Sequence, residues 1–271
     1  MHLRSAHDVA TDRDFSVHEF SCVDDHTGWF GDYQTSYQVV LVRAGMFRVR
    51  RGGVVAEMDH TVSYLAVPGA EEEFAHPATG EVCTVITLTP RLWRSMAGEA
   101  PLTRRHAYTT AQIELTHRRM LAAEADPGYA LTEQLLDLLA GMLRQTAARA
   151  APAFERSTSA DHALVDQARA AIGADHPSAL RLGSLAAALG VSPYRLSRAF
   201  PRALGVSLTH YRNRVRITHA LDRLQAGEPS LAALAADLGF ADQAHLTRTV
   251  RDHLGHTPTA LRRMLTRRDS H

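Results

Sequence analysis

The spacing of hydrophobic residues changes along this chain. Up to about residue 90, short runs of β-branched and aromatic residues are separated by Gly45, Gly52-Gly53, Pro68-Gly69 and Gly80; the runs cover residues 37–42, 46–50, 61–67 and 82–88. Short strands with this turn punctuation indicate a small sandwich or barrel. Later residues have apolar positions at helical spacing. The pattern predicts an α+β chain in which strands precede helices.

Two helices are expected directly after the strands, over about residues 110–147, with Asp126-Pro127-Gly128 separating them. The second helix carries an apolar stripe, which consists of Leu131, Leu135, Leu138, Leu139 and Met142. A stripe of this kind is expected to pack against the strands as core.

The last third of the chain contains a repeat with a period near 50 residues. Residues 185–207 read LAAALGVSPYRLSRAFPRALGVS and residues 234–257 read LAADLGFADQAHLTRTVRDHLGHT. Each copy has a short helix, a glycine, a turn, a capping residue and a second helix with Arg on its polar face. This order is typical of a helix-turn-helix, so two such units are predicted, at about 182–204 and 231–254.

The turn residues of the first unit agree with this interpretation. Gly190 tolerates a left-handed turn, Ser192 is a preferred N-cap, and Pro193 fits the first helical position. Leu196 and Phe200 then point inward. The outer face keeps polar and cationic side chains, namely Tyr194, Arg195, Ser197, Arg198 and Arg202.

The second unit repeats the plan, with Gly239 at the turn and Asp242 as the expected cap. Its outer face carries Gln243, His245, Arg248 and Arg251. Arg and Gln side chains match guanine and adenine edges in the major groove. An isolated Arg is usually only solvated surface, but Arg198 and Arg248 recur at the same place in two units. We therefore expect these two residues to be the principal base readers.

Residues 164–263 resemble the DNA-binding domain of the AraC/XylS family of bacterial transcription regulators. The resemblance rests on the first unit, on the linking segment LTHYRNRVRITHALDRLQAG, and on the second unit with Gly239-Phe240, Leu246, Arg248 and Gly255-His256-Thr257-Pro258. Pro201 departs from the family pattern, and proline inside a helix removes a backbone hydrogen bond. The first reading helix is therefore expected to bend or to end early, which puts Arg202 in doubt as a contact.

The resemblance implies a two-domain α+β protein with an N-terminal cupin-like β-barrel with trailing helices and a C-terminal all-α domain of two helix-turn-helix motifs joined by a linker helix. It implies a sequence-specific, DNA-binding transcription regulator without a cofactor, with activation as the commoner sign. Base-reading residues would be Tyr194, Arg195, Arg198, Gln243, His245 and Arg248. Phosphate contacts are expected from Arg202, Arg212, Arg214, Arg251 and Thr257.

The family resemblance also implies partners. These are double-stranded DNA, RNA polymerase, a small-molecule effector in the barrel, and a second copy of the chain, with part of the stripe on the trailing helices as a dimer interface. No membrane partner is expected, because the sequence has neither a long apolar run nor a signal peptide, and this predicts a cytoplasmic protein.

Charge separates the same two parts of the chain. Residues 161–271 contain 15 Arg against 9 acidic residues, whereas residues 1–160 contain 15 Arg against 20. A basic half is suited to nucleic acid. We therefore divide the chain into an effector and dimerisation domain at 1–150, a linker at 151–160, where Ala, Ser, Thr and Pro prevail, and a DNA-binding domain at 161–271.

The N-terminal part offers two alternatives to plain effector binding. Cys22, His26, His76 and Cys83 are candidate ligands for a thiophilic metal, or Cys22 and Cys83 form a redox pair, which gives a metal- or redox-sensing regulator. Buried structural cysteines and scattered surface histidines remain the simpler explanation.

A cupin-type metalloenzyme is the remote alternative. It lacks support because the chain has no His-x-His motif, and the acidic run at residues 71–73 is expected to be a solvated loop. We therefore expect a protein that is not an enzyme.

Overall fold

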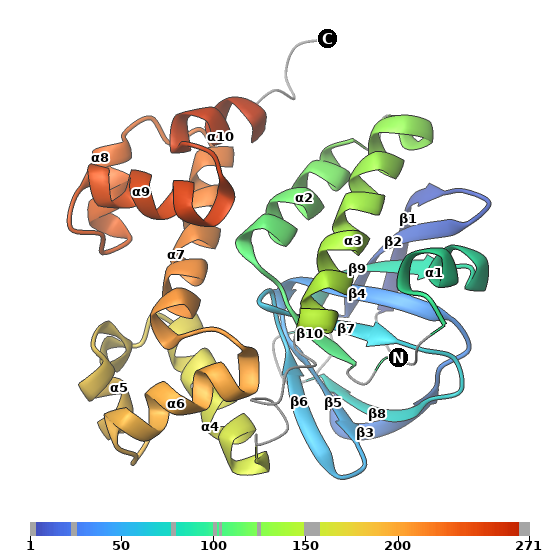
Figure 1. Cartoon of the computed structure of the whole chain (residues 1–271), viewed down its shortest axis with the longest axis horizontal. Coiled ribbons are helices and arrows are strands. Elements are labelled where there is room, and N and C mark those ends of the chain that lie inside the picture. The colour runs from blue at the N-terminus through green and yellow to red at the C-terminus, as the bar shows by residue number, and fades with distance from the viewer. Residues whose placement is uncertain are drawn as a thin grey trace.

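The structure is a computed structural model that describes residues 4–22, 26–76, 80–99, 102, 105–123, 126–148 and 158–265. A strand-rich part with three helices occupies one side of the molecule, and an all-helical part occupies the other (Figure 1). The predicted α+β class, with two helix-turn-helix motifs joined by a helix, is confirmed. The expected linker at 151–160 lies largely outside the described residues.

The strands form two antiparallel sheets. The larger sheet has the order β1-β2-β9-β4-β7-β10 and the smaller one β3-β8-β5-β6. The strands are β1 (Arg4–Thr11), β2 (Phe15–Cys22), β3 (His26–Tyr33), β4 (Tyr37–Gly45), β5 (Phe47–Arg51), β6 (Val54–Met58), β7 (Val62–Ala66), β8 (Glu71–His76), β9 (Glu81–Leu88) and β10 (His106–Tyr108). Gly52 and Gly53 both have positive φ in the β5–β6 turn, as a tight hairpin requires.

The helices follow in two groups. The first group is α1 (Pro90–Ala97), α2 (Ala111–Ala122), the π-helical turn η1 (Pro127–Leu131) and α3 (Thr132–Ala148). The second group is α4 (Ser159–Gly173), the 3-10 turn η2 (Pro177–Leu180), α5 (Leu182–Ala188), α6 (Pro193–Leu204), α7 (Leu208–Gln225), α8 (Leu231–Asp237), α9 (Gln243–Leu254) and α10 (Pro258–Leu265). Among the described residues, no helix combines the length and the hydropathy that a membrane span needs.

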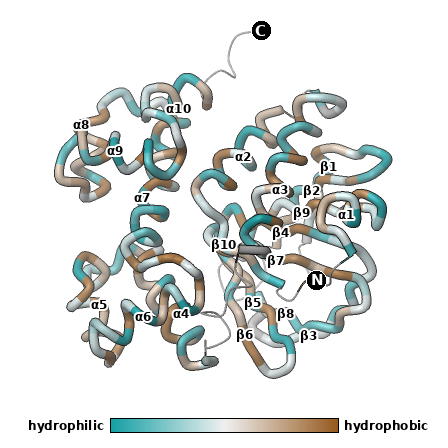
Figure 2. Tube along the Cα trace, in the orientation of Figure 1, coloured by the Kyte–Doolittle hydropathy of each residue, from teal (hydrophilic) through white to brown (hydrophobic). Residues whose placement is uncertain are grey.

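Each face of the larger sheet has its own hydrophobic partner. Val40 and Val42 of β4 point toward the smaller sheet, where they join Phe47 and Phe74. Val39 and Leu41, which alternate with them, pack with the helices that cover the opposite face. This alternation follows from the two-residue period of a strand. Figure 2 shows the corresponding mixture of hydrophobic and hydrophilic positions along the strands and helices.

The apolar stripe on η1 and α3 is core. Its five residues are at most 2% exposed and pack against the larger sheet; they are Leu131, Leu135, Leu138, Leu139 and Met142. The expectation that part of this stripe is a dimer interface is therefore wrong, because the chain itself already covers it.

The two halves of the molecule share hydrophobic contacts. Ala111 and Leu115 of α2 lie in one buried cluster with Ile217 and Leu221 of α7. A second cluster joins the space between the sheets to residues of α4, α6 and α7, including Phe200 of α6. The DNA-binding half expected from the sequence is thus packed on the strand-rich half.

Two local expectations are wrong. The acidic run at 71–73 is not a solvated loop but part of β8, and alternation along that strand buries Glu72, which accepts a hydrogen bond from the Tyr64 hydroxyl. Helix α6 does not end early at Pro201; it continues to Leu204 and ends at Gly205, whose φ is positive. The proline therefore leaves one carbonyl without a helical partner but does not stop the helix.

Candidate nucleic-acid interface and its contacts with the strand-rich domain

The first helix-turn-helix unit is formed by α5 and α6. Gly190 has φ +67° in the turn, and the Ser192 hydroxyl accepts a hydrogen bond from the Arg195 amide at 3.2 Å. Leu196 and Phe200 are fully buried beneath the helix. The predicted turn, cap and buried residues are confirmed.

The second unit, α8 and α9, uses the same chemistry. Gly239 has φ +70°, and Asp242 Oδ1 accepts a hydrogen bond from the His245 amide at 2.6 Å. Leu246, Val250 and Leu254 form the buried face. Because both reading helices start at a side-chain cap, their first turns are fixed in orientation.

Most of the side chains predicted to read bases are exposed. Tyr194 is 74% exposed, and the other exposed members of the set are Arg195, Arg198, Gln243 and Arg248. Several donors on one helix face are what contact with base edges requires.

His245 differs from the rest of this set. It is half-buried, its Nδ1 accepts a hydrogen bond from the Ala241 amide at 3.3 Å, and its ring meets Phe240 edge to face at 5.4 Å. Any contact of this histidine with a base therefore has to use Nε2.

The predicted phosphate contacts lie in different surroundings. Arg251 is exposed on α9, and Arg202 is exposed with its guanidinium 3.9 Å from Asp161. Thr257 caps α10 by accepting a hydrogen bond from the Ala260 amide. Arg212 is half-buried and lines a cavity of about 310 Å³ beside α4 and η2.

Arg214 cannot contact phosphate in this structure, so its assignment is corrected. Its side chain is 0% exposed, and its guanidinium faces the strand-rich half. Nε donates to the Thr109 carbonyl at 2.9 Å, and Nη2 donates to the His60 carbonyl at 3.3 Å. The helical period of α7 places Arg214 on the inner face with Tyr211 and Thr218.

Glu114 of α2 is the charged partner of Arg214. The carboxylate lies 2.6 Å from Arg214 Nη1 and accepts a hydrogen bond from Thr218 Oγ1 at 3.0 Å. Burial raises the pKa of Glu114, but Arg214 and Arg118 outweigh it and lower the pKa to about 2. The carboxylate is therefore ionised at neutral pH, and one buried ion pair connects the two halves.

Arg118 extends this connection toward the end of α7. Its Nη2 lies 2.5 Å from Glu114 Oε1 and 2.6 Å from Asp222 Oδ1. Its Nη1 donates to Gln225 Oε1 at 3.0 Å. The Arg118 guanidinium therefore connects α2 with α7.

A second buried arginine joins the halves at α4. Arg169 lies 2.8 Å from Asp59 and 2.7 Å from Asp166, and it donates to the Glu57 carbonyl at 3.1 Å. Burial raises the pKa of Asp59, but Arg169 outweighs it, and the resulting pKa is about 2. For Asp166 burial has the largest effect on the pKa, and it raises the pKa to about 6.

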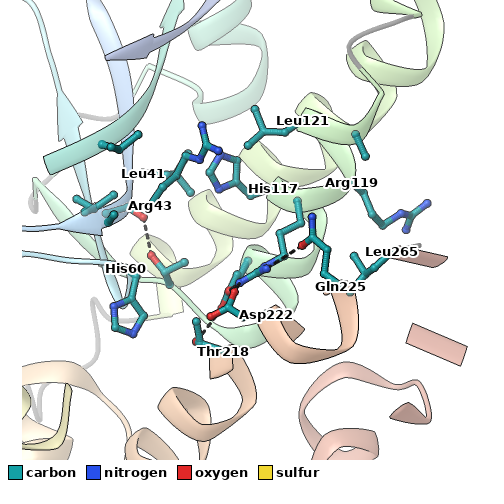
Figure 3. Close-up of a pocket in the computed structure, with 18 of the residues that line it drawn as sticks. Leu41, Arg43, His60, His117, Arg119, Leu121, Thr218, Asp222, Gln225 and Leu265 are labelled. Atoms are coloured by element: carbon teal, nitrogen blue, oxygen red, sulfur yellow. Dashed lines mark hydrogen bonds and ion pairs between the residues drawn. The ribbon is translucent and has the colours of Figure 1, made fainter. Parts of the chain in front are cut away.

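A cavity of about 440 Å³ lies beside the Glu114 network. Figure 3 shows that its walls come from both halves: Leu41 and Arg43 from β4, His117 and Leu121 from α2, and Gln225 from α7. The sequence predicted an effector site inside an N-terminal barrel, whereas this cavity lies between the strand-rich half and the helices of the C-terminal half.

The candidate metal ligands are only partly brought together. Cys22 and His76 lie near each other, and Glu81 completes a buried group whose ligand atoms all lie within 4.8 Å of one another. Cys83 is outside this group; burial, followed by the charges of Glu81 and Cys22, raises the pKa of its thiol. Both cysteines are free thiols. The side chain of His26 lies outside the described residues.

Comparison with known proteins matches the same part of the chain. Residues 185–264 match the family model of a helix-turn-helix domain. The probable transcription factor PqrA of Proteus vulgaris is 30% identical over 92 residues, which cover 34% of this chain and 75% of that protein. The chain belongs to the AraC family of transcription regulators.

Two other proteins are similar to this AraC-family chain at a lower sequence identity than PqrA. The Msm operon regulatory protein of Streptococcus mutans is 26% identical over 110 residues, 41% of this chain and 40% of that protein. A crystal structure of a Chromobacterium violaceum transcriptional regulator with an AraC-type DNA-binding domain is 24% identical and covers 41% of this chain and 99% of that one, with a TM-score of 0.37.

Sequence reasoning missed the residues that connect the two halves of this AraC-family regulator. Glu114, Arg118 and Arg169 lie on helices whose charges are also compatible with a solvated face. The available signal was one of spacing, because Glu114 and Arg118 lie four residues apart and Arg214 and Thr218 do as well. Glu81 gave no signal of its own, since it reaches the Cys22 group only through strand pairing.

Proposed function

We propose that this AraC-family regulator binds a specific double-stranded DNA site through the exposed faces of α6 and α9. The observation that supports this function best is the repeated, capped reading helix whose exposed face carries Arg198 in one unit and Arg248 in the other. Tyr194, Arg195 and Gln243 complete the exposed base-reading set, with His245 contributing Nε2. Arg202, Arg212, Arg251 and Thr257 remain the proposed phosphate contacts.

Selection of bound sequences from a random duplex library tests this proposal. The purified full-length protein should enrich one motif that spans two successive major-groove segments, because α6 and α9 each read one segment. A non-specific, nucleoid-type protein binds DNA through the same basic half but enriches no motif. A helix-turn-helix part that serves only as an interaction module retains no duplex. Either outcome would contradict the proposed function.

We propose further that the strand-rich domain controls DNA binding through its contact with α7. The Glu114–Arg214 pair holds α7, the helix between the two units. The Arg169–Asp59 pair holds α4, which shares a buried cluster with α6 of the first unit. A change in either pair therefore alters the setting of the reading helices. Selective binding of an effector to one arrangement would shift the equilibrium between arrangements.

The cavity beside this contact is the proposed effector site. A molecule there touches β4, α2 and α7 together, and its volume of about 440 Å³ is in the range of small-molecule sites. The test is a thermal shift of the protein with fractionated small-molecule extracts. Ala122→Trp obstructs the cavity and should abolish a shift that the wild-type protein shows. Ala232→Trp, at an exposed position of α8 away from the cavity, should retain the shift. A shift unchanged by Ala122→Trp would place the effector elsewhere.

The proposed sign of regulation is activation, with RNA polymerase as the partner, and the proposed assembly is a homodimer that does not use the α3 stripe. A promoter fusion with the bound motif upstream should lose expression when the regulator is deleted. Increased expression after deletion would instead indicate repression. Light scattering of the full chain measures its mass and tests the dimer.

A further inference from the structure

We infer that Cys22, His76 and Glu81 form a binding site for a thiophilic divalent metal ion such as zinc. The site lies at the end of the strand-rich domain where the two sheets meet, and it does not depend on the proposed DNA contacts. It differs from the metal alternative in the sequence because it includes Glu81 and leaves out Cys83 and His26.

Strand pairing explains why these three residues meet. Cys22 is the last residue of β2 and lies directly opposite Glu81, the first residue of β9. Opposite residues of an antiparallel pair place their side chains on the same face of the sheet. His76 is the last residue of β8 in the other sheet, and its Nδ1 lies 2.5 Å from Glu81 Oε1. One ligand therefore comes from each of three strands.

The donor set fits zinc, and the three ligand atoms lie within 4.8 Å of one another. A thiolate, an imidazole nitrogen and a carboxylate oxygen are all ordinary zinc ligands. Two N or O ligands of tetrahedral zinc lie about 3.3 Å apart, given bond lengths of about 2.0 Å. The His76–Glu81 pair therefore needs to open by less than about 1 Å. Three protein ligands leave the fourth position of a tetrahedral zinc ion for water.

The burial of the three side chains is a second reason to expect a bound cation. Cys22 is 2%, His76 7% and Glu81 3% exposed. The ring of His76 stacks on Phe30 at 5.4 Å and lies 6.1 Å from Phe47, so the surroundings are largely aromatic. Within the described residues, Glu81 Oε2 is buried and accepts no hydrogen bond. A buried carboxylate oxygen without a donor is unfavourable, and a bound metal ion compensates it.

Gly45 closes this end of the larger sheet beside the group. It lies opposite Glu81 on the β4 side of β9, has φ +70°, and faces the Gly80 carbonyl so closely that a side chain has no space. The start of β9 is therefore fixed from both neighbouring strands, which holds the Glu81 backbone in place for coordination.

Cobalt(II) is the probe that tests the site, because its thiolate complexes absorb in the near ultraviolet. Titration of the reduced full-length protein with Co²⁺ should give a thiolate-to-metal charge-transfer band that saturates at one equivalent. Zinc should displace the cobalt and remove the band. A protein that produces no such band with excess Co²⁺ would overturn the site and leave Cys22, His76 and Glu81 as a structural group.

Three variants assign the ligands. Cys22→Ser should abolish the band, and Glu81→Gln, which keeps the size of the side chain, should weaken Co²⁺ binding at least about tenfold. Cys83→Ala is the matched control. Cys83 is a buried cysteine like Cys22, but it lies on β9 outside the group. This variant should leave the band unchanged. Loss of the band in Cys83→Ala but not in Glu81→Gln would overturn the assignment.

Thermal melting keeps the test independent of folding defects in the variants. One equivalent of Zn²⁺ should raise the melting temperature of the wild type and of Cys83→Ala, because a ligand that binds only the folded state stabilises it. The same addition should leave folded Glu81→Gln unchanged or nearly so. An equal rise in all three proteins would show that zinc binds somewhere else.

Discussion

Glu114 and Arg214, which are separated by 100 residues in the sequence, form an ion pair of 2.6 Å that is almost fully enclosed between the two halves of the molecule. Arg214 is one of the four arginines that the sequence predicted to contact DNA phosphate. Because a buried guanidinium without an anion is very costly, this pair makes the position of α7 dependent on α2.

Removal of the Glu114 carboxylate should destabilise the protein strongly. Glu114→Ala leaves the Arg214 guanidinium buried without its anion, and we expect a loss of about 3 kcal/mol in the free energy of unfolding. Urea denaturation followed by circular dichroism measures this loss. Glu19→Ala is the matched control, because it breaks the exposed Arg43–Glu19 pair and should have little effect.

A second variant separates the charge effect from simple loss of packing. Glu114→Ala combined with Arg214→Met removes both charges, so it should recover a large part of the stability lost in Glu114→Ala alone. A double variant that is less stable than Glu114→Ala would contradict this account of the pair.

Acid should destabilise the protein from pH 6.5 downward, partly because of His117. Burial is the largest cause that lowers the pKa of His117, followed by the charge of Arg43, and the result is about 3. The neutral ring forms a hydrogen bond of 2.9 Å with Thr84. Between pH 6.5 and 3 the unfolded chain binds a proton at this residue and the folded chain does not. The free energy of unfolding should therefore fall with decreasing pH, by up to about 1.4 kcal/mol per unit for this residue.

The variant His117→Gln tests that contribution. It should make the dependence of unfolding free energy on pH shallower in this range. His253 adds to the same window, because burial and His210 lower its pKa to about 4, so some slope will remain. An identical slope in wild type and His117→Gln would mean that His117 is protonated in the folded protein.

The sequence was most informative where local chemistry decides the structure. Gly190, Ser192 and Pro193 specify a turn and a helix start through their own backbone preferences, so the first helix-turn-helix unit was predictable without tertiary knowledge. The role of Arg214 was not predictable. A helical period separates the inner from the outer face of a helix, but it does not reveal that Glu114 of another helix is the partner of Arg214. The same reason explains Glu81, whose neighbours are set by the pairing of β2 with β9.

Replacement of Pro201 should stabilise α6. The helix continues past this exposed residue to Leu204, so alanine restores an amide donor for the preceding turn without changing the path of the chain. We expect Pro201→Ala to raise the free energy of unfolding by about 1 kcal/mol or more. Ser197→Ala in the same helix controls for the general gain from alanine and should give less than half of that value. A loss of stability in Pro201→Ala would mean that the proline itself makes favourable contacts.

Arg248 and Arg251 should separate base reading from phosphate contact. Both are exposed on α9, three residues apart, so the two variants remove the same side chain from adjacent positions on one helix. Arg248→Ala should weaken binding to the selected motif by about 1 to 3 kcal/mol and leave binding to random duplex nearly unchanged. Arg251→Ala should weaken both alike and lower the slope of log affinity against log salt by about 1. Fluorescence anisotropy with both duplexes over a salt series measures the affinity of each variant for each duplex and the salt slope. Equal losses on the two duplexes for Arg248→Ala would remove this residue from the base-reading set, because a phosphate contact carries no sequence information.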